Sequence, residues 1–502
     1  MFKKILIANR GEIAVRIIKA CRENGIKAAA VYSEADRKSL HVQIADEAVC
    51  IGPAPAVDSY LNMDAIVQAA RKVGAEAIHP GYGFLSENAA FARRCEKERL
   101  IFIGPHSKAL ELVGDKVRSR LTMEKAGIPI IPGMKNIAEK MEVYEQEAKR
   151  IGYPVMIKAS AGGGGKGMRV IKDPADLRPG LEAGRREAKA AFGDESVYLE
   201  KYIEEPRHVE FQVLADNFGH TVHLYERECS IQRRHQKIVE ESPSTALDPE
   251  LRAEMGETAR KVMEVSGYNN AGTVEFLLDK NKNFYFLEVN ARLQVEHPVT
   301  ELVTGVDLVQ QQILVASGKK LDYSQENIKQ NGHAIECRIY AEDPLSNFLP
   351  SSGKILFLKE PWGPGIRHDC GVYSGCEIPI FYDPILAKLI VWAENREKAC
   401  SRMIQALEDY VILGINTTID FLKDVVAHPR FCEGKITTHF IESYFEDWQG
   451  REKTDESKRL ALIAAAAAEG NKTLRPEKES GSFKNLPTPW RTLGKWRLGG
   501  KH

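Results

Sequence analysis

The fold of the middle of this chain is decided by the stretch Val274-Glu275-Phe276-Leu277-Leu278-Asp279-Lys280-Asn281-Lys282-Asn283-Phe284-Tyr285-Phe286-Leu287-Glu288-Val289-Asn290. Two apolar runs flank a short polar segment, and this pattern predicts a β-hairpin with its loop at Lys280–Asn283. If Asp279 pairs with Phe284, counting outward places Glu275 opposite Glu288 on one face. Asn290 then lies on the same face, two residues further along its strand.

This pair of facing glutamates predicts a metal site. Two carboxylates that face each other repel unless a cation lies between them. With the amide oxygen of Asn290 they form a ligand set that suits Mg²⁺, which also takes oxygens from substrate phosphates. The alternative is a solvent-exposed hairpin with incidental acids, but the apolar flanks favour the metal site.

An anion site is predicted directly after the hairpin, in the run Asn290-Ala291-Arg292-Leu293-Gln294-Val295-Glu296-His297-Pro298. Arg292 offers a planar fork that suits a small oxyanion such as bicarbonate. Glu296 is placed to act as a base beside it. The basic stretch Arg233-Arg234-His235-Gln236-Lys237 would complete an anion pocket, although such a stretch alone is more often a solvated run of charges.

A phosphate-binding flap is predicted from the run Ala161-Gly162-Gly163-Gly164-Gly165-Lys166-Gly167-Met168. The glycines let backbone N–H groups approach phosphate oxygens, and Lys166 adds a cation. The run differs from a P-loop because neither Ser nor Thr follows the lysine. It lies between the predicted strands Val155–Lys158 and Arg169–Ile171, so it forms the turn of a flexible hairpin.

Two lysines outside the glycine run are further candidates for phosphate contacts. Lys158 ends the strand just before the run, and Lys116 lies in Gly114-Asp115-Lys116. The alternatives are that the glycines are a mobile linker and that each lysine is a solvated surface charge.

The first hundred residues alternate between strand and helix patterns, which predicts a parallel sheet. The predicted elements, in chain order, are Lys4–Ala8, Glu12–Asn24, Ala28–Tyr32, Ala65–Val73, Glu76–Ile78, Asn88–Glu98 and Leu100–Ile103. Gly25 ends the first helix. Residues 1–114 are therefore expected to form an open, Rossmann-like α/β domain.

Three further regions follow in the predicted organisation. Residues 115–334 form a central domain that contains the flap within a mobile lid at about 131–203. Residues 335–450 are rich in short strands and close with the helices Arg396–Glu408 and Thr418–Ala427, which indicates a mixed α/β domain. Residues 451–502 form a tail in which the helix Lys458–Glu469 precedes a stretch expected to lack fixed structure.

Composition excludes several functional classes. The 502 residues contain 70 Lys and Arg and 70 Asp and Glu, so no net positive charge attracts nucleic acid or an anionic membrane. The nine cysteines include no Cys-x-x-Cys pair, which is typical of a reduced, cytoplasmic protein. Neither a signal sequence nor an apolar run long enough to cross a membrane is present.

Taken together, five motifs resemble those of the biotin carboxylase family in the ATP-grasp superfamily. They are the glycine run and the segments Ile7–Ala14, His79–Asn88, Arg227–Lys237 and Phe286–Thr300. The resemblance covers residues 1 to about 445. It implies an ATP-grasp fold for the central domain. The run departs from the family only in opening with Ala161 and in carrying Lys166, where relatives often have Gly and Arg, and both changes are expected to be tolerated.

The resemblance implies a set of nucleotide-binding residues. ATP would be held by Lys116, Lys158, Gly163, Gly164, Gly165, Lys166, Gly167, Met168, Glu200, Lys201, Ile203, His208, Gln232, His235 and Leu278. Glu200–Ile203 would be a hinge strand beside the adenine, and His208, Gln232 and His235 would lie near the ribose.

The resemblance also implies roles around the reacting groups. Glu275, Glu288 and Asn290 would bind two Mg²⁺ or Mn²⁺ ions, and Lys237, Arg292, Gln294 and Val295 would bind bicarbonate. Glu296 would be the general base, and Arg338 would stabilise the enolate of biotin. The catalytic set is therefore Glu296, Arg338, Lys237 and Arg292.

The implied reaction is carboxylation of biotin through carboxyphosphate. Biotin is normally carried on a lysine flanked by methionines, and no Met-Lys-Met motif occurs here. The expectation is one component of a multi-subunit acetyl-CoA, acyl-CoA or pyruvate carboxylase. It would work with a separate biotin carboxyl carrier protein and a carboxyltransferase, and the family suggests a homodimer.

Two other functions remain open at this point. Another ATP-grasp ligase, such as a carbamoyl-phosphate or purine-type synthetase, would share the nucleotide site and the metal hairpin. A nucleotide-binding protein without catalysis would keep the fold alone. The run from Arg292 to Glu296 together with Arg338 favours biotin over both.

Overall fold

The computed structural model describes residues 1–134, 137–138, 140–159, 168–234 and 236–450. Several predictions lie outside these residues, namely those on Gly163, Gly164, Gly165, Lys166, Gly167, His235 and the tail helix Lys458–Glu469. The chain divides into two units, Met1–Gln449 and Gly450–His502. All elements described below belong to the first unit.

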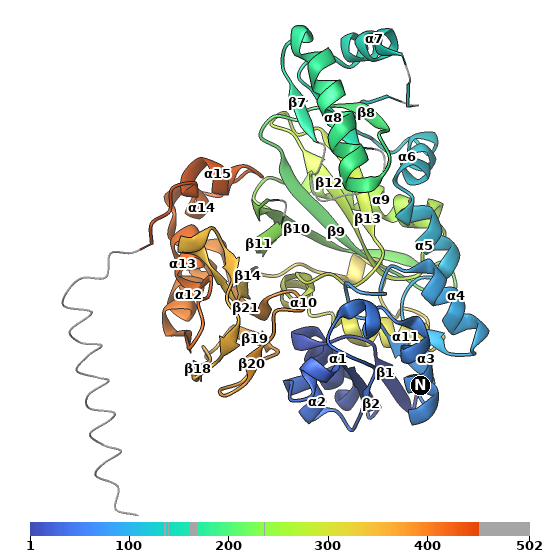
Figure 1. Ribbon diagram of the computed structural model, residues 1–502, viewed down its shortest axis with the longest axis vertical. Coiled ribbons are helices and arrows are strands. Elements are labelled where there is room, and N and C mark those ends of the chain that lie inside the picture. The colour runs from blue at the N-terminus through green and yellow to red at the C-terminus, as the bar shows by residue number, and fades with distance from the viewer. Residues whose placement is uncertain (135–136, 139, 160–167, 235, 451–502) are drawn as a thin grey trace, which may run out of the picture. The chain divides into compact units, whose positions relative to one another are not determined.

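A five-stranded parallel sheet forms the N-terminal part of the chain (Figure 1). Its strand order is β3-β2-β1-β4-β5, with β1 (Lys4–Ile7), β2 (Lys27–Tyr32), β3 (Glu47–Cys50), β4 (Ala77–His79) and β5 (Ile101–Phe102). The connecting helices include α1 (Gly11–Glu23), α3 (Met63–Val73) and α4 (Ala89–Lys97). The predicted parallel α/β fold is confirmed. The sequence did not predict β3, a four-residue edge strand with mostly exposed side chains.

Helices cover both faces of this sheet because β1 is apolar on both sides. Ile5 and Ile7 are buried in a core shared with α1. Leu6 and its neighbour Ala8 are buried in a second core shared with α3. A continuous apolar run is typical of a parallel strand buried on both faces.

A small antiparallel sheet forms the region of the predicted lid. Its order is β7-β6-β8, with β6 (Val155–Ala159), β7 (Arg169–Ile171) and β8 (Val197–Lys201). Helices α7 (Met141–Ile151) and α8 (Leu177–Phe192) pack on it around a core of their own. The two strands predicted on either side of the glycine run pair as a hairpin, with Val155 opposite Ile171.

The largest element is an eight-stranded antiparallel sheet in the order β13-β12-β9-β10-β11-β14-β21-β19. Its strands are β9 (Arg207–Ala215), β10 (Thr221–Arg233), β11 (Gln236–Ser242), β12 (Asn270–Leu278), β13 (Phe284–Asn290), β14 (His333–Tyr340), β19 (Ile366–Cys370) and β21 (Ile385–Ala393). Strands β11 and β14 pair from Val239–Cys337 to Ser242–Ala334. The sheet is therefore continuous across the predicted boundary at residues 334 and 335.

The half of this sheet formed by β11, β14 and β21 has one apolar and one ionic face. On the apolar face, residues such as Cys337 and Leu389 pack in a core with α12 (Arg396–Asp409) and α13 (Ile419–Ala427). On the other face lie Glu240, Glu336, Arg338 and Lys388, all buried. This ionic face contacts α10 (His297–Thr304) and α1. Because side chains alternate along each strand, the two faces share the same strands.

The register of the predicted hairpin is right at the glutamates and wrong at the turn. Glu275 is opposite Glu288, as predicted, but Phe284 pairs with Leu278 instead of Asp279. A β-bulge between the Glu275 and Phe276 pairs accommodates one extra residue, Leu287, in β13. A bulge shifts the pairing by one residue, and the simple count outward from the turn did not include one.

Further elements connect and cover these sheets. Helices α5 (Ser107–Gly114) and α6 (Lys116–Lys125) follow the parallel sheet, and α9 (Pro249–Val265) packs on β9 and β10. Other elements are α2 (Leu40–Ile44), α11 (Leu308–Ala316), α14 (Pro429–Cys432), α15 (Phe440–Phe445), β15 (Glu342–Asp343), β16 (Leu349–Pro350), β17 (Gly353–Lys354), β18 (Phe357–Lys359), β20 (Glu377–Ile378) and β22 (Val411–Leu413). Within the described ranges, no helix combines the length and apolar character needed to cross a membrane.

The start of α1 lies directly against the end of β19. A Cβ atom on Gly371 would lie 2.5 Å from the backbone nitrogen of Glu12 and 2.8 Å from the carbonyl carbon of Gly11. Only a residue without a side chain allows this approach of two backbones.

Gly371→Ala is expected to destabilise the protein, because neither backbone can move away without disturbing the ionic face. We expect a loss of about 1–3 kcal/mol in the free energy of unfolding, visible as a lower melting temperature. The matched control is Gly114→Ala at the end of α5, where a Cβ atom meets nothing within 4 Å. A melting temperature that is equal in both variants would contradict the close approach.

Glu241 of β11 is expected to lower the free energy of unfolding as the pH becomes acidic. Burial works to raise its pKa, but His333 at 2.6 Å and Arg396 at 2.7 Å lower the pKa to about 2. A lowered pKa stabilises the fold above the unfolded value of about 4.5, and this stabilisation is lost as the pH falls towards 2. Glu241→Gln should cost on the order of 3 kcal/mol at pH 7 and much less at pH 3. Melting curves across this range test it, and a cost independent of pH would contradict the ion pairs.

Candidate active site

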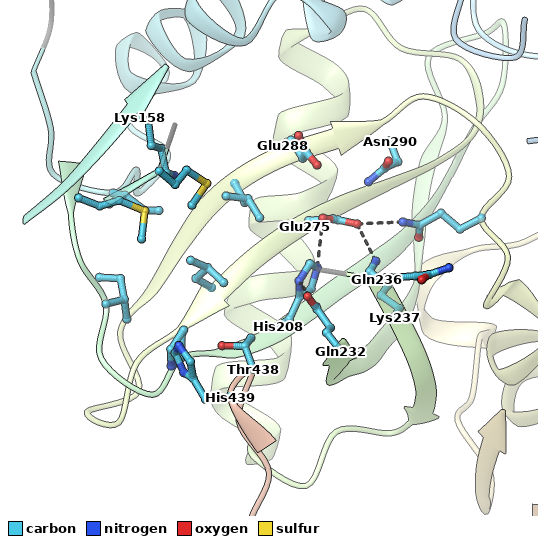
Figure 2. Close-up of a pocket in the computed structure, with 18 of the residues that line it drawn as sticks. Lys158, His208, Gln232, Gln236, Lys237, Glu275, Glu288, Asn290, Thr438 and His439 are labelled. Carbon is cyan, nitrogen blue, oxygen red and sulfur yellow. Dashed lines mark hydrogen bonds and ion pairs between the residues drawn. The ribbon is translucent and has the colours of Figure 1, made fainter. Parts of the chain in front are cut away.

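A cavity of about 480 Å³ lies between the lid sheet and the eight-stranded sheet (Figure 2). Most of the described residues predicted as site residues line it, from both sheets and from the segment before α10. They are Lys158, Met168, Lys201, Ile203, His208, Gln232, Lys237, Glu275, Glu288, Asn290, Arg292, Gln294, Val295, Glu296 and Arg338. Three predicted residues, Lys116, Glu200 and Leu278, are not among the lining residues.

The ammonium group of Lys237 is the centre of the ionic part of this cavity. It donates to carboxylate oxygens of Glu210 at 2.5 Å, Glu275 at 2.7 Å and Glu296 at 2.9 Å. Burial alone would lower the pKa of Lys237, but the three carboxylates hold it well above its usual range. Lys237 is therefore charged, and it joins the predicted metal site to the predicted anion site.

Arg227 supports this cluster from beneath and was not predicted as a site residue. It is fully buried and donates to Glu210 at 2.7 Å and to Gln294 Oε1 at 2.5 Å. Further bonds reach Gln212 and Thr300. The sequence placed Arg227 in a motif, but its partners come from β9, from the segment before α10 and from α10 itself, so no local pattern indicates this role.

The predicted metal ligands lie together at the edge formed by β12 and β13. Glu275 and Glu288 are cross-strand neighbours, and Asn290 lies beside them in Figure 2. Glu275 also accepts from Gln294 at 3.0 Å and lies 3.1 Å from His208, while Glu288 lies 3.3 Å from Lys116. Burial works to raise the pKa of Glu275, but Lys237 and His208 hold it well below its usual range. The oxygens of Glu275, Glu288 and Asn290 fit a hard divalent cation.

The segment before α10 presents its backbone to the cavity. Glu296 is the N-cap of α10, so the positive end of the helix dipole faces the predicted anion site. Arg292 lies beside this segment, where it donates to Glu87 at 3.1 Å and to Asn290 at 2.9 Å. These two hydrogen bonds hold Arg292 in place, and its planar guanidinium group suits a small anion.

Arg338 lies between two buried glutamates. It donates to Glu240 at 2.6 Å and to Glu296 at 3.0 Å. Burial raises the pKa of Glu240 to about 7 and that of its cross-strand neighbour Glu336 well above the usual range. Neither carboxylate oxygen of Glu336 has a hydrogen-bond partner in the described part of the chain. Burial thus favours the protonated form of Glu336, and Arg338 is shared by Glu240 and Glu296.

The lid sheet contributes a basic group to the cavity. Lys158 of β6 donates to Glu200 at 2.6 Å, and Arg120 of α6 also pairs with Glu200. Lys201 donates to the carbonyl oxygens of Gly152 and Tyr153, both at 2.9 Å. The side chain of Glu200 thus pairs with Lys158 and Arg120. Its neighbours Lys201 and Ile203 line the cavity itself.

One predicted contact of the nucleotide is wrong. Leu278 is buried in the core between β12 and α9, and Leu277 lines the cavity instead. Side chains alternate along a strand, so Leu277, two residues after Glu275, lies on the same face of β12 as Glu275. Met156, Leu277 and Leu287 make an apolar part of the cavity beside His208.

Two lining residues were missed because they come from the C-terminal region. Thr438 and His439 lie before α15 and reach the cavity edge opposite Lys158 in Figure 2. His439 Nε2 lies 3.3 Å from the hydroxyl of Tyr202. Nothing in their local sequence differs from an ordinary loop.

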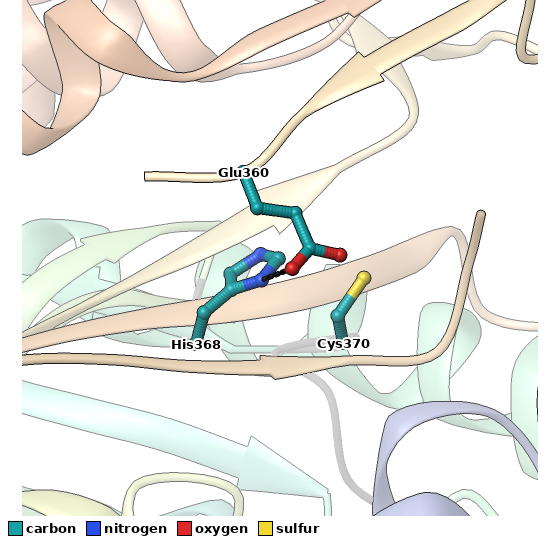
Figure 3. Close-up of side chains that lie close together, drawn as sticks. All are labelled: Glu360, His368 and Cys370. Atoms are coloured by element: carbon teal, nitrogen blue, oxygen red, sulfur yellow. Dashed lines mark ion pairs between the residues drawn. The ribbon is translucent and has the colours of Figure 1, made fainter. Parts of the chain in front are cut away.

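A second group of potential metal ligands, Glu360, His368 and Cys370, lies close together (Figure 3), and none of the three lines the cavity. His368 Nε2 is hydrogen-bonded to the Tyr410 hydroxyl at 2.7 Å, and its Nδ1 lies 3.5 Å from the half-exposed Glu360. Burial raises the pKa of the Cys370 thiol to about 12, so this thiol is protonated. The group is accounted for by packing and by the pair of His368 and Glu360.

Comparisons with known proteins agree with this geometry. Residues 1–110 match the family described as "Biotin carboxylase, N-terminal domain", residues 115–324 match "Carbamoyl-phosphate synthase L chain, ATP binding domain", and residues 336–443 match "Biotin carboxylase C-terminal domain". Biotin carboxylase 1 of Bacillus subtilis is 54% identical over 445 residues, which cover 88% of this chain and 99% of that protein. A pyruvate carboxylase subunit from Methanothermobacter thermautotrophicus is also 54% identical, over 88% of this chain and 90% of that one.

A solved structure gives the same result in three dimensions. The biotin carboxylase domain dimer of Hydrogenobacter thermophilus 2-oxoglutarate carboxylase, in complex with MgADP, ADP and bicarbonate, is 52% identical with a TM-score of 0.83. The match covers 88% of this chain and 98% of that structure. The chain therefore belongs to the biotin carboxylase family, and its central part has the ATP-grasp fold.

Proposed function

We propose that different residues of this cavity act in different steps of biotin carboxylation, which passes through carboxyphosphate. The chain is an ATP-dependent ligase that carboxylates biotin with bicarbonate, as its family membership establishes. The observation that supports the assignment of residues is that a single cavity joins the carboxylates of Glu275 and Glu288 to Lys237 and Arg338.

The nucleotide is assigned to the part of the cavity between the two sheets. Lys158 and Lys116 are placed to neutralise phosphate oxygens as the γ-phosphoryl group transfers. The apolar side chains of Met156 and Leu277 suit the flat adenine ring, and His208 and Gln232, which are hydrogen-bonded at 3.0 Å, are placed beside the ribose.

Glu275, Glu288 and Asn290 are assigned to the divalent cations, either Mg²⁺ or Mn²⁺. When bound, such ions neutralise the charge of the phosphate oxygens. The ion pairs that these carboxylates make with Lys237 and Lys116 would then be exchanged for bonds to metal.

Bicarbonate is assigned to Arg292, Lys237 and the backbone of Val295 at the start of α10, with Gln294 beside them. In this position a bicarbonate oxygen attacks the γ-phosphorus atom of ATP, which gives carboxyphosphate and ADP. Carboxyphosphate then breaks down to CO₂ and phosphate, and enclosure by the two sheets protects these products from water.

Glu296 is assigned as the base, and its surroundings explain how its basicity is controlled. Burial works to raise its pKa, but Lys237 and Arg338 hold the pKa far below its usual range. A carboxylate so stabilised is a weak base. When bicarbonate engages Lys237 and the biotin oxygen engages Arg338, both cations are drawn away and the pKa of Glu296 rises. Proton removal from biotin N1 is thus favoured only with both substrates present.

Arg338 is assigned to the ureido oxygen of biotin. Loss of the N1 proton places negative charge on this oxygen, and the guanidinium stabilises it while the nitrogen attacks CO₂. We assign the biotin to a separate biotin carboxyl carrier protein and the next step to a carboxyltransferase. The Methanothermobacter relative, which is named as one subunit of a pyruvate carboxylase, supports a multi-subunit enzyme, and the dimer of the Hydrogenobacter structure supports a homodimer.

Variants of Glu275 and Arg338 are expected to fail in different ways. Glu275→Gln should abolish ATP cleavage with and without biotin, because it removes a metal ligand. Arg338→Ala should keep the slow bicarbonate-dependent ATP cleavage and lose about a hundredfold or more of biotin carboxylation, since biotin takes no part in forming carboxyphosphate. The two reactions are measured as ADP release and as incorporation of ¹⁴C-bicarbonate into free biotin.

Stability is the necessary control, because Arg338 also pairs with buried Glu240. The double variant Glu240→Gln with Arg338→Ala leaves no unpaired carboxylate at that position and should behave like Arg338→Ala. Arg396→Met, which removes the arginine paired with neighbouring Glu241, should lower the melting temperature without separating the two activities. A folded Arg338→Ala protein with the parental rate of carboxylation would refute the assignment of Arg338.

A further inference from the structure

Two successive carbonyl groups of the segment before α10 are held by buried side chains. The carbonyl oxygen of Gln294 accepts from His297 Nδ1 at 2.7 Å, and that of Val295 accepts from the ammonium of Lys388 at 2.9 Å. Both side chains are fully buried. The orientation of two consecutive peptide groups is thus fixed from inside the protein.

The direction of these carbonyls decides where the N–H groups point. A trans peptide is planar, with its N–H directed opposite to its C=O. The peptide whose carbonyl is held by His297 carries the N–H of Val295, and the one held by Lys388 carries the N–H of Glu296. Within the described residues, neither N–H donates a hydrogen bond to another group of the chain. Fixed, unused N–H groups at a helix N-terminus form an anion site.

Lys388 is placed by the ionic face of the eight-stranded sheet. It lies on β21 directly across from Arg338 on β14 and has no exposed surface. Its ammonium also lies 3.4 Å from Glu12 Oε2 and 3.9 Å from Asp369 Oδ2. A buried ammonium is costly unless carboxylates compensate it. Glu12 is the nearer of the two carboxylates, and Asp369 is also held by Arg367 at 2.8 Å.

Glu12 connects this contact to two sequence motifs for which no catalytic role was assigned. It belongs to the motif Ile7–Ala14, in the first turn of α1, and is itself fully buried. Its second carboxylate oxygen accepts from the hydroxyl of Tyr82, in the motif His79–Asn88. The N-terminal domain thus reaches the anion site through Glu12 and Lys388.

We infer that Lys388 is a positioning residue for bicarbonate, which holds the carbonyl of Val295 so that the adjoining N–H groups face the anion, and that Glu12 keeps its ammonium in place. This inference rests on the proposed assignment of bicarbonate to Val295 and Arg292. Lys388 itself does not line the cavity. Its effect passes through the backbone, so it acts on the binding of one substrate.

The test compares the KM for bicarbonate with the KM for MgATP in the full-length chain, measured from bicarbonate-dependent ADP release. Lys388→Met removes the donor but leaves Glu12 as an unpaired buried carboxylate. The double variant Glu12→Gln with Lys388→Met removes both charges and keeps the fold testable. In this double variant we expect the KM for bicarbonate to rise about tenfold or more, because one charge-assisted hydrogen bond to the Val295 carbonyl is lost. The KM for MgATP should stay within about twofold.

Two controls separate positioning from general damage. Glu12→Gln alone keeps Lys388 and an amide oxygen beside it, so most of the rise in KM should appear only when Lys388 is lost. Arg396→Met removes a different, partly buried cation that pairs with Glu241 of the same sheet, and it should leave the KM for bicarbonate unchanged.

Each remaining outcome decides against a particular claim. If the double variant binds bicarbonate as the parent does, or if both KM values rise together, Lys388 has no positioning role. If ADP release by the parental chain does not depend on bicarbonate, the proposed function fails and the inference fails with it. A parental chain that does respond to bicarbonate separates the two cases.

Discussion

The ion pairs between Lys237 and the carboxylates of Glu210, Glu275 and Glu296 are the interaction on which the rest of the cavity depends. These acids come from the neighbouring strands β9 and β12 and from the N-cap of α10, so one ammonium joins the sheet to the start of a helix. Three buried carboxylates so close together would repel strongly without it, and removing one partner of a buried pair is far costlier than removing both. The arrangement keeps the acids ionised and in place before any substrate arrives.

The same constraint applies across the ionic face of the sheet. On this face the acids outnumber the cations Arg338 and Lys388. The acids include Glu12, Glu240, Glu296 and Glu336. Part of this imbalance is offset because burial raises the pKa of Glu336. The rest is resolved by sharing, because Arg338 contacts two glutamates and Lys237 contacts three. A set of shared cations responds as a whole when a substrate engages one of them.

The sequence predicted the fold class from local patterns, and the resemblance of its motifs to a family supplied most of the described residues that line the cavity. Glu275 and Glu288 could be placed opposite each other from a short hairpin. Leu278 was placed beside the nucleotide by the resemblance alone, and the alternation of side chains along β12 puts Leu277 there instead. Thr438 and Lys388 could not be predicted, because each reaches the site only through pairing of distant strands or loops.

The pairing of β11 with β14 also limits how the protein can be divided or recombined. The family match over residues 115–324 ends before β14 and the match over 336–443 begins within it, yet the hydrogen bonds of the sheet join β14 to β11. A fragment that stopped there would expose an unpaired strand edge, which favours aggregation. Exchange of segments between homologous enzymes would therefore preserve folding best if β9 to β21 were transferred together. The smallest segment that can be exchanged without breaking the sheet therefore extends across the boundary between the two matched domains.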